Sequence, residues 1–397
     1  MLIINGRIYT MSHAPIHSGY VITKGSKIVE TGDMATLKAN SYKDEEILDV
    51  KGAWILPGLI EAHAHIGITE EKWGAIGDDC NEQTSPVTPF LRAIDAVNPM
   101  DPAFHEAIKA GITSVMTGPG SANVVGGQFL FMKTHGRCVD DMTVLEPAAM
   151  KAALGENPKT VYGNQGECPS TRMGSASLLR EVLYKAREYF RQKENRKLKT
   201  VDFHMEPWIP VFRREIPLKV HAHRADDILT AIRIAREFHI DLTIDHGTEG
   251  HLIAEEIKAS GFPVIVGTGL TSRSKLEVQN MDFKTNHVLH EAGILIAVTT
   301  DHPVALIQYL PLCAGLAVKA GLPMEEGLKA ITINPAKICR VSHRVGSLEP
   351  GKDADIAIFS GNPMEILTRT LYTIIDGRII YRDEENSCSH LLQLGVQ

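Results

Sequence analysis

Long hydrophobic runs are missing from this 397-residue sequence. No stretch approaches the ~18 consecutive apolar residues of a membrane-spanning helix, so we expect no membrane partner. The first residues, MLIINGRIYTM, also lack the basic and apolar segments of a secretory signal. Hydrophobic residues nevertheless make up 44% of the chain and charged residues 22%, which predicts a folded globular protein rather than a disordered one.

Basic charge and paired cysteines are also scarce. The 41 lysines and arginines are outnumbered by 48 acidic residues, and with no basic stripe we expect no nucleic-acid partner. The 6 cysteines form no CxxC pair, which favours reduced thiols in a cytoplasmic protein over a disulfide framework. No GxGxxG motif follows a predicted strand and no serine or cysteine lies in a nucleophile elbow, so neither dinucleotide binding nor covalent catalysis has support.

Short strand-like segments separated by turns occur at both ends of the sequence. They occupy residues 1–55 and return over residues 345–382, where Asp376-Gly377 is a strong hairpin signal. We therefore predict one small β-sandwich domain that is built from both chain ends. Residues 383–397 have no clear pattern and are interpreted as a carboxyl-terminal tail.

Between these ends, strand-like and helix-like segments alternate. The strand Leu218–His221 leads into a helix over Asp226–Phe238, whose apolar residues recur at helical spacing, and the strand Leu242–Asp245 follows. Buried Val/Ile/Leu strands separated by helices are typical of a parallel sheet that is covered on both faces. Residues 56–344 have the length of one closed (β/α)8 barrel, so the predicted fold class is α/β with a TIM-type barrel. The alternative is an open doubly wound sheet.

The clearest chemical motif is a pair of histidines at the end of an apolar strand, in the segment PGLIEAHAH. His63 and His65 are two residues apart, so both imidazoles lie on the same side of the strand. Neutral imidazole is a good ligand for zinc and similar ions. His221, His246 and Asp301 each end a further predicted strand. Since the carboxyl ends of parallel barrel strands open onto one face, these groups should converge there as a metal site.

Several segments of the sequence share the pattern of one enzyme superfamily. They are residues 49–52 (DVKG), 56–60 (LPGLI), 63–65 (HAH), 220–223 (VHAH), 244–247 (IDHG), 300–303 (TDHP) and 346–355 (GSLEPGKDAD). With these segments the chain resembles the amidohydrolase superfamily, in particular its imidazolonepropionase-like and prolidase-like metal-dependent hydrolases. The resemblance covers nearly the whole chain. It implies a barrel, a composite β domain and one or two divalent metal ions, with zinc first and iron, manganese or nickel as alternatives.

The resemblance also implies roles for the converging groups. His63 and His65 would bind one metal together with Asp301. His221 and His246 would bind a second metal or, in one-metal members, the metal and the substrate carbonyl. Asp301 would take a proton from a metal-activated water and pass it to the leaving nitrogen. Asp301 and His246 are therefore the catalytic candidates.

Two-metal members of the superfamily also need an anionic bridge, which is usually a glutamate or a carboxylated lysine. Glu156 follows a predicted strand in a loop bounded by Gly and Pro and is the favoured metal ligand. Lys133 ends the apolar run Phe129–Met132 and is the alternative. Without a metal role, Glu156 would be a solvated loop acid and Lys133 a lysine that extends from a barrel strand.

Four further residues are candidates for substrate binding. Arg172 and Arg273 lie in irregular segments and are forked donors suited to a carboxylate, although Arg172 could equally lie in the first turn of the following helix. His223 and His302 adjoin ligand positions, where they could contact the substrate or orient the ligands.

The leading functional hypothesis is hydrolysis of a carbon–nitrogen bond in a small molecule: an amide, a cyclic amide, an N-acyl amino acid or a dipeptide. The alternatives are a deaminase or amidine hydrolase on the same barrel, and a non-catalytic scaffold homologue. Deaminases of the superfamily carry a glutamate three residues after the fifth-strand histidine, and Arg224 occupies that position here. A scaffold would be expected to lose metal ligands, and these are present. The sequence leaves a monomer and a homo-oligomer both open.

Overall fold

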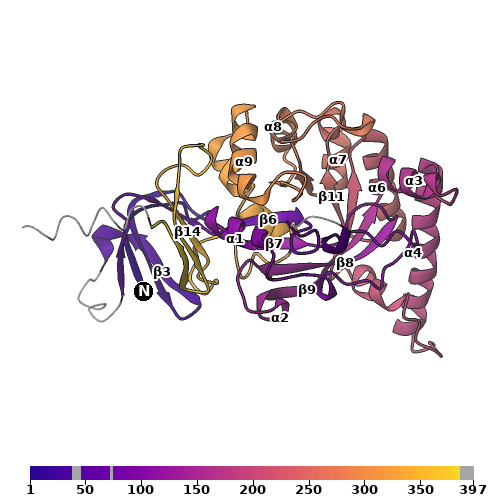
Figure 1. The fold of residues 1–397 in the computed structure, drawn as a ribbon, viewed down its shortest axis with the longest axis horizontal. Coiled ribbons are helices and arrows are strands. Elements are labelled where there is room, and N and C mark those ends of the chain that lie inside the picture. Colours follow the sequence, from indigo (N-terminus) through magenta and orange to yellow (C-terminus); the bar gives the residue numbers. More distant parts are fainter. Residues whose placement is uncertain (38–45, 72–74, 385–397) are drawn as a thin grey trace, which may run out of the picture.

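The structure, a computed structural model, describes residues 1–37, 46–71 and 75–384. The predicted carboxyl-terminal tail, residues 383–397, lies outside the described residues except for Asp383 and Glu384. Figure 1 shows two parts: a β sheet formed by the indigo and yellow ends of the chain, and a larger α/β part formed by the middle. None of the helices in the described ranges is both long and apolar enough to cross a membrane.

The two ends of the chain share one sheet. Its strands are β1 (Leu2–Ile8), β2 (Ile16–Lys24), β3 (Lys27–Asp33), β4 (Ile47–Asp49), β5 (Trp54–Pro57), β14 (Ile356–Phe359), β15 (Thr370–Ile375) and β16 (Arg378–Arg382). They are ordered β16-β15-β14-β5-β1-β2-β3, with β4 beside β1, and the ends join through the antiparallel pair of β14 and β5. Because the described strands follow one continuous hydrogen-bonded order, a β-sandwich of two sheets is not confirmed.

The middle of the chain forms a second sheet that curves into a barrel. Its strands are β6 (Leu59–Ala64), β7 (Ile112–Thr117), β8 (Val125–Lys133), β9 (Thr143–Ala153), β10 (Leu218–Ala222), β11 (Leu242–His246), β12 (Val264–Val266) and β13 (Ile296–Val298). They lie in chain order from β6 to β13, unlike the strands of a doubly wound sheet. The backbone N–H of His65, just after β6, donates to the carbonyl of His302, after β13 (2.8 Å), so the sheet is nearly closed like a TIM-type barrel.

One barrel strand departs from the predicted all-parallel arrangement. Strand β8 is antiparallel to both β7 and β9. Only residues 118–124 connect β7 to β8, whereas a parallel connection needs a crossover of roughly a dozen residues or more. The carboxyl end of β8, where Lys133 lies, is therefore at the rim opposite to the carboxyl ends of the parallel strands.

Helices cover the outside of the barrel. The α-helices of the described residues are α1 (Pro102–Lys109), α2 (Val139–Met142), α3 (Glu156–Asn164), α4 (Arg172–Glu194), α5 (Ile209–Phe212), α6 (Ala225–Phe238), α7 (Ala254–Ser260), α8 (Lys284–Glu291), α9 (Leu310–Lys319), α10 (Met324–Lys329) and α11 (Ile333–Ile338). Helix α6 corresponds to the helix predicted over Asp226–Phe238. Its apolar face is buried next to β10 and β11, with Ile228, Ala231, Ile232, Ala235 and Phe238.

A buried carboxylate joins β6 to the end of β13, where the barrel closes. Glu61 accepts hydrogen bonds from Thr299 Oγ1 (2.6 Å), Thr300 N (2.8 Å) and Thr300 Oγ1 (2.7 Å). It also accepts one from the backbone N–H of His63 (3.0 Å). Burial raises the pKa of Glu61, and these donors oppose the shift. Glu61 thus stabilises the closure and holds the backbone that presents His63.

Replacing Glu61 with glutamine is expected to lower the free energy of unfolding by about 1–3 kcal/mol. The glutamine amide would turn N–H groups toward the donors of Thr300, which then lose an acceptor in a fully buried site. Urea unfolding would measure the change. Glu256→Gln on exposed α7 is the control and should change stability by less than about 0.5 kcal/mol. A Glu61→Gln effect as small as that of the control would contradict this role.

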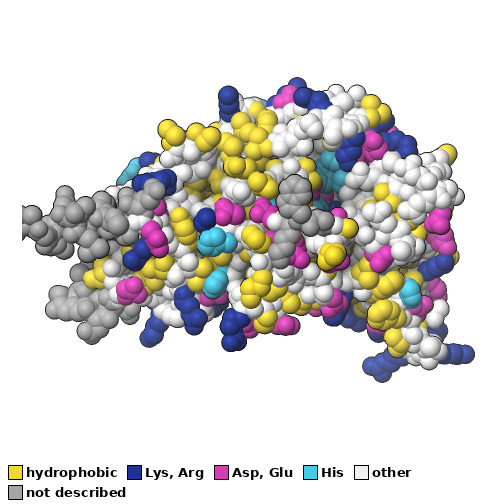
Figure 2. All heavy atoms as spheres, viewed as in Figure 1, with side chains coloured by type: hydrophobic (Ala, Val, Ile, Leu, Met, Phe, Trp, Pro, Cys, Tyr) yellow, Lys and Arg dark blue, Asp and Glu magenta, His cyan; other side chains and the backbone are white. Residues whose placement is uncertain are grey.

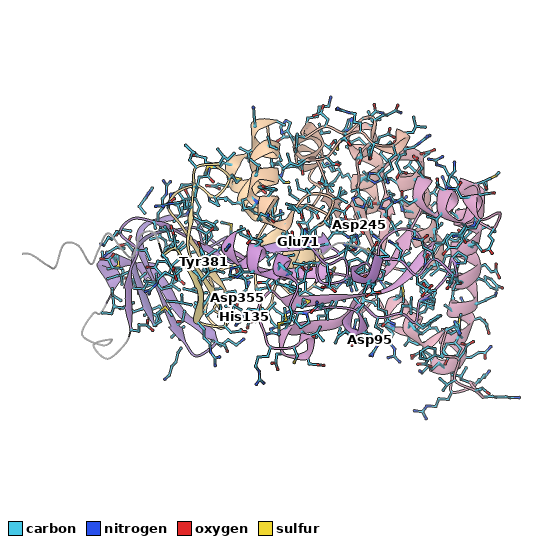
Figure 3. The ribbon with its side chains drawn as sticks, in the orientation of Figure 1. Glu71, Asp95, His135, Asp245, Asp355 and Tyr381 are labelled. Atoms are coloured by element: carbon cyan, nitrogen blue, oxygen red, sulfur yellow. The ribbon has the colours of Figure 1, made fainter. Side chains whose placement is uncertain are left out.

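Lys133 joins the barrel to the sheet of the chain ends. Its Nζ lies 3.1 Å from Asp353 and 3.4 Å from Asp376, and it forms a close ion pair with Asp355. Figure 3 places Asp355 toward the sheet of the chain ends and Asp245 within the barrel. Burial alone would lower the pKa of Lys133, but the three carboxylates outweigh burial and raise it. The prediction of Lys133 as a carboxylated metal ligand is wrong, because the reversed direction of β8 carries it to the opposite rim.

Candidate functional site

A cavity of about 290 Å³ opens at the carboxyl ends of the parallel strands. Its volume is close to the ~300 Å³ at which small-molecule sites begin. Figure 2 shows histidine side chains recessed below the surrounding surface. The lining residues include His63, His65, His221, His246 and Asp301. The structure thus brings together the residues that the sequence places at strand ends.

The first group able to hold a metal consists of His63, His246 and Asp301, whose nitrogen and oxygen atoms lie within 4.8 Å of one another. The Nε2 atoms of His63 and His65 are each 3.3 Å from Oδ1 of Asp301. Both histidines of the HAH segment therefore meet at one carboxylate oxygen. Separations of about 3–4 Å between donor atoms are those that bonds of ~2 Å to one ion produce.

The second group able to hold a metal consists of His221, His223 and His246. The ring centroid of His221 is 4.4 Å from that of His246, and the centroid of His223 is 4.6 Å from each of the other two. His246 belongs to both groups and lies between them. The sequence predicts a substrate contact for His223, whereas the structure places it among the potential ligands.

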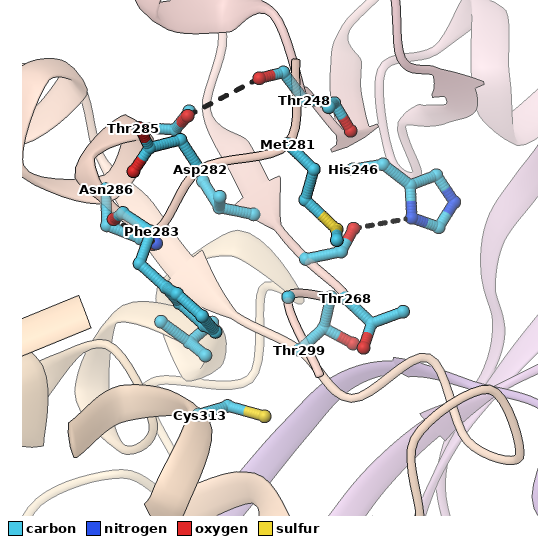
Figure 4. A pocket seen from close by; sticks show the side chains of 14 residues that line it. His246, Thr248, Thr268, Met281, Asp282, Phe283, Thr285, Asn286, Thr299 and Cys313 are labelled. Atoms are coloured by element: carbon cyan, nitrogen blue, oxygen red, sulfur yellow. Dashed lines mark hydrogen bonds between the residues drawn. The ribbon is translucent and has the colours of Figure 1, made fainter. Parts of the chain in front are cut away.

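Backbone oxygens orient two of these imidazoles. The Nδ1 atom of His65 is 2.7 Å from the carbonyl of Gly118, and Nδ1 of His246 is 2.8 Å from the carbonyl of Gly267. Figure 4 shows the second contact at the edge of a small hollow next to the cavity. Each Nδ1–H therefore donates to a carbonyl, so Nε2 is the nitrogen of each ring that can bind a metal.

A buried carboxylate lies behind His63. Asp245 Oδ2 is 3.3 Å from His63 Nδ1, while Nε2 of the same ring faces Asp301. Lys219 Nζ (2.8 Å) and Lys151 Nζ (3.4 Å) hold the Asp245 carboxylate in place. A carboxylate in this position fixes the orientation and tautomer of a ligand histidine. Sequence reasoning missed these partners, although Lys219 stands two residues before His221 on β10 and so shares its side of the strand.

The protonation states of three of these histidines suit a cation. Burial lowers the pKa of His63, His221 and His246 well below the ordinary value, so these rings are neutral at pH 7. Burial also opposes the charge on His65, but Cys80 and Asp301 beside it raise the pKa of His65 to about 10, so an ion bound there would have to displace a proton from this ring.

Several buried atoms of the site lack hydrogen bonds among the described residues. Within the described structure, His63 Nε2 and Asp301 Oδ1 are buried without a hydrogen-bond partner. A buried polar atom without a partner is costly, and a divalent ion would satisfy both. The donor set therefore fits a metal centre.

Two residues of the site have an uncommon backbone conformation. His246 has φ of 73° and Asp301 has φ of 54°, both in the left-handed region. Non-glycine residues adopt this region rarely, and such positions concentrate at functional sites. The turns that follow β11 and β13 thus aim these two side chains at the cavity.

A carboxylate that sequence reasoning missed lies next to the second group. Glu277 is fully buried, and its Oε1 is 3.7 Å from His221 Nε2 and 3.8 Å from His223 Nε2. Glu156, the predicted ligand, only donates its backbone N–H to Glu277 Oε2 (2.9 Å). The neighbouring Asn157 lines the cavity instead. The carboxylate beside these histidines thus comes from the segment after β12, which carries no motif in the sequence.

The structure does not bring the other predicted substrate contacts to the cavity wall. Arg172 begins α4, and its Nε lies 3.0 Å from Asp227 Oδ2 on the outside of the barrel. Arg273 is exposed and donates to the carbonyls of Gln279 (3.0 Å) and Met281 (2.9 Å). His302 is fully buried, and its Nδ1 accepts from the backbone N–H of Ile307 (3.2 Å). The two guanidinium groups are occupied by protein partners that the sequence does not indicate.

Residues 54–380 of the chain match the Amidohydrolase family. The chain belongs to this family. The resemblance that the sequence motifs predict is thereby confirmed. Members of the amidohydrolase family typically bind a divalent metal, and the homologues include hydrolases and deaminases.

Individual amidohydrolase relatives differ in how much they share with this chain. An amidohydrolase from Thermotoga maritima MSB8 of known structure is 41% identical, with a TM-score of 0.92 over 96% of this chain and all of that one. The imidazolonepropionase of Rhizobium meliloti (strain 1021) is 23% identical over 92% of this chain and 90% of its own length. Amidohydrolase tasK of Hapsidospora irregularis is 26% identical over 86% of this chain, which spans only 38% of that protein. A Xaa-Pro dipeptidase structure, at 16% identity and a TM-score of 0.58, shares the fold.

Proposed function

We propose that this protein is a metal-dependent hydrolase that cleaves a carbon–nitrogen bond in a small amide, cyclic amide, N-acyl amino acid or dipeptide. The observation that carries the proposal is the pair of ligand groups that meet at His246 in the wall of an open cavity. Imidazole and carboxylate donors of this kind suit zinc first, with iron, manganese or nickel as alternatives.

Particular residues would hold the ions. His63, His65 and Asp301 would hold one ion, and His221, His223 and His246 would hold another, with Glu277 beside them. Lys151 on β9 and Lys219 on β10 are both buried beside the first group, and Lys151 takes the place of Lys133 as candidate for a carboxylated ligand. Burial lowers the pKa of Lys151, which favours the free amine that would react with carbon dioxide.

The residues of the chain supply the proton transfers. A divalent ion supplies an activated water and polarises the scissile carbonyl. The side chain of Asp301 is 13% exposed, so its carboxylate reaches both the ligand histidines and the cavity. It would accept the proton of the attacking water and return it to the leaving nitrogen. If only one ion is bound, His246, which belongs to both ligand groups, would orient the carbonyl instead.

Elemental analysis of protein purified without a chelator tests this proposal. We expect at least one equivalent of a divalent transition ion per chain. Its removal by a chelator should abolish turnover in a screen of cyclic amides, N-acyl amino acids and dipeptides, and zinc should restore it. A content below about 0.2 equivalents, with no uptake after zinc is added, would rule out the metal site.

The deaminase alternative has less support from the site. Arg224, in the position of the deaminase glutamate, pairs with Asp226 (2.9 Å) at the start of α6 and supplies no carboxylate. A 5-methylthioadenosine/S-adenosylhomocysteine deaminase of Bacillus cereus (strain AH187) is 31% identical, but over only 28% of this chain. Hydrolysis of an amide bond is therefore favoured over hydrolytic deamination. A non-catalytic scaffold would have no reason to keep two complete ligand groups.

A further inference from the structure

One cation projects into the cavity wall from the segment that follows β12. Lys275 comes just before the 3-10 helix Leu276–Val278, and it is the one lysine or arginine among the described residues that line the cavity. Its neighbours in that wall are neutral hydroxyl groups, those of Thr271, Ser272 and Ser274. A single positive charge among hydroxyl donors is a suitable environment for a monoanion.

The ammonium group of Lys275 is held by protein partners that do not use all of its hydrogen-bond donors. Nζ donates to Asn157 Oδ1 (2.7 Å) and forms an ion pair with Glu277 Oε1 (2.8 Å). An ammonium group has three donors, so one is left for a ligand. The side chain is 26% exposed on the cavity side, whereas that of Glu277 is fully buried. Buried Glu277 thus orients the ammonium group, and a substrate can reach only the lysine of this pair.

The position of Lys275 relative to the histidines sets the distance between an anion and the reacting bond. The carboxamide of Asn157 spans the interval, because its oxygen accepts from Lys275 and its nitrogen lies 3.5 Å from His221 Nε2. Lys275 and His221 are therefore linked through a single carboxamide, so an anion on Lys275 would lie close to the histidine cluster. In an N-acyl amino acid the carboxylate is one carbon away from the scissile nitrogen, so an amide bound at the histidines would bring its carboxylate near Lys275.

The charge of the cavity favours a carboxylate over a phosphate. Asp78 and Asp301 also line the cavity, and Glu277 already offsets part of the charge of Lys275. A dianion would meet net repulsion, whereas a carboxylate needs only one charge-assisted hydrogen bond and neutral donors.

We propose that Lys275 binds the free carboxylate of the substrate and so makes the enzyme selective for amides that carry a carboxylate next to the scissile nitrogen. This inference rests on the proposed hydrolase function. It assigns the anion-binding role to Lys275 in place of Arg172 and Arg273, whose guanidinium groups bind protein partners.

Matched acid and amide probes test the proposal on the full-length, metal-loaded protein. The probes are N-acetylglycine and N-acetyl-L-leucine, each paired with its primary amide, with turnover and calorimetric binding as readouts. Wild type should prefer each acid by roughly 10- to 100-fold in KM or Kd, as expected for one hydrogen bond to a charged group. Lys275→Met should remove this preference by weakening the acid alone, and Lys275→Arg should keep part of it.

Two controls separate charge recognition from structural support. Lys284→Met removes an exposed lysine that pairs with Asp282 (3.3 Å) on α8, and it should leave all four probes unchanged. Elemental analysis and thermal unfolding of each Lys275 variant show whether metal and fold persist. If Lys275→Met unfolds, Lys275→Gln takes its place, since glutamine keeps a donor for Asn157.

Three results would overturn the proposal. The first is equal binding of acid and amide by wild type. The second is an equal loss of acid binding and amide binding in Lys275→Met. The third is no detectable binding of either acid at 10 mM, a concentration of roughly ten times the usual upper KM. Metal content separates this failure from failure of the proposed function. A protein that binds no metal refutes the proposed hydrolase function. A metal-loaded protein that binds acid and amide equally refutes the role of Lys275 alone.

Discussion

Asp301→Asn is expected to lower kcat by about 10²–10⁴ while the metal stays bound. The amide keeps an oxygen that can face the Nε2 atoms of His63 and His65, both 3.3 Å from Oδ1 in the wild type. It cannot accept the proton of the attacking water or return it to the leaving nitrogen. The expected pattern is therefore a large loss in kcat with a small change in KM and in metal content.

His63→Ala provides the comparison, because it deletes a ligand instead of a proton acceptor. His63 is fully buried and its Nε2 has no hydrogen-bond partner in the described structure, so the truncation should lose the ion and the activity together. Elemental analysis and steady-state kinetics on both variants distinguish the two roles. If Asp301→Asn kept more than about a tenth of the wild-type kcat with metal bound, another base would have to act, with His246 as the first candidate.

Lys133→Met is expected to lower the free energy of unfolding by about 3–5 kcal/mol. The substitution would leave the buried carboxylates of Asp353 and Asp355 without the ammonium group that lies between them. Urea unfolding would measure the loss, and metal content should be unchanged because Lys133 is at the opposite rim. Lys27→Met removes a half-exposed lysine that is 2.7 Å from Asp353 and should cost less than about 1 kcal/mol. A comparable effect of the two substitutions would contradict the central role of Lys133.

The same cluster predicts how this stabilisation depends on pH. Burial would raise the pKa of Asp353, but Lys133, Lys27 and Arg344 lower it. Its contribution is therefore present above the ordinary aspartate pKa of about 4 and is lost as the pH falls through the lowered value. The raised pKa of Lys133 gives a contribution that is complete below about pH 10 and is lost at higher pH. Burial raises the pKa of Asp355 despite Lys133, so the difference between wild type and Lys133→Met should grow as the pH rises until both aspartates are ionised, and it should fall above about pH 9.

The candidate metal centre is the part of the molecule most accessible from the sequence. His63 and His65 share a strand at a spacing of two, and His221, His246 and Asp301 follow apolar strands. A period of two determines which side chains share one side of a strand, and parallel strands present their carboxyl ends together. These local rules are enough to predict that distant histidines meet at one cavity, and the family motifs indicate the fold.

The residues that surround the candidate metal centre could be identified only from the tertiary structure. Lys133 ends an apolar strand as the histidines do, yet the short connection from β7 reverses that strand and carries the lysine to the other rim. Arg273 and Lys275 are two residues apart in one irregular segment, and only Lys275 lines the cavity. Periodicity determines which side chains share one face of a strand or helix. The direction of β8 follows from its short connection to β7, which the periodicity of side chains does not report. The side chain that a loop turns inward is decided by contacts between segments far apart in the chain, which no local pattern contains.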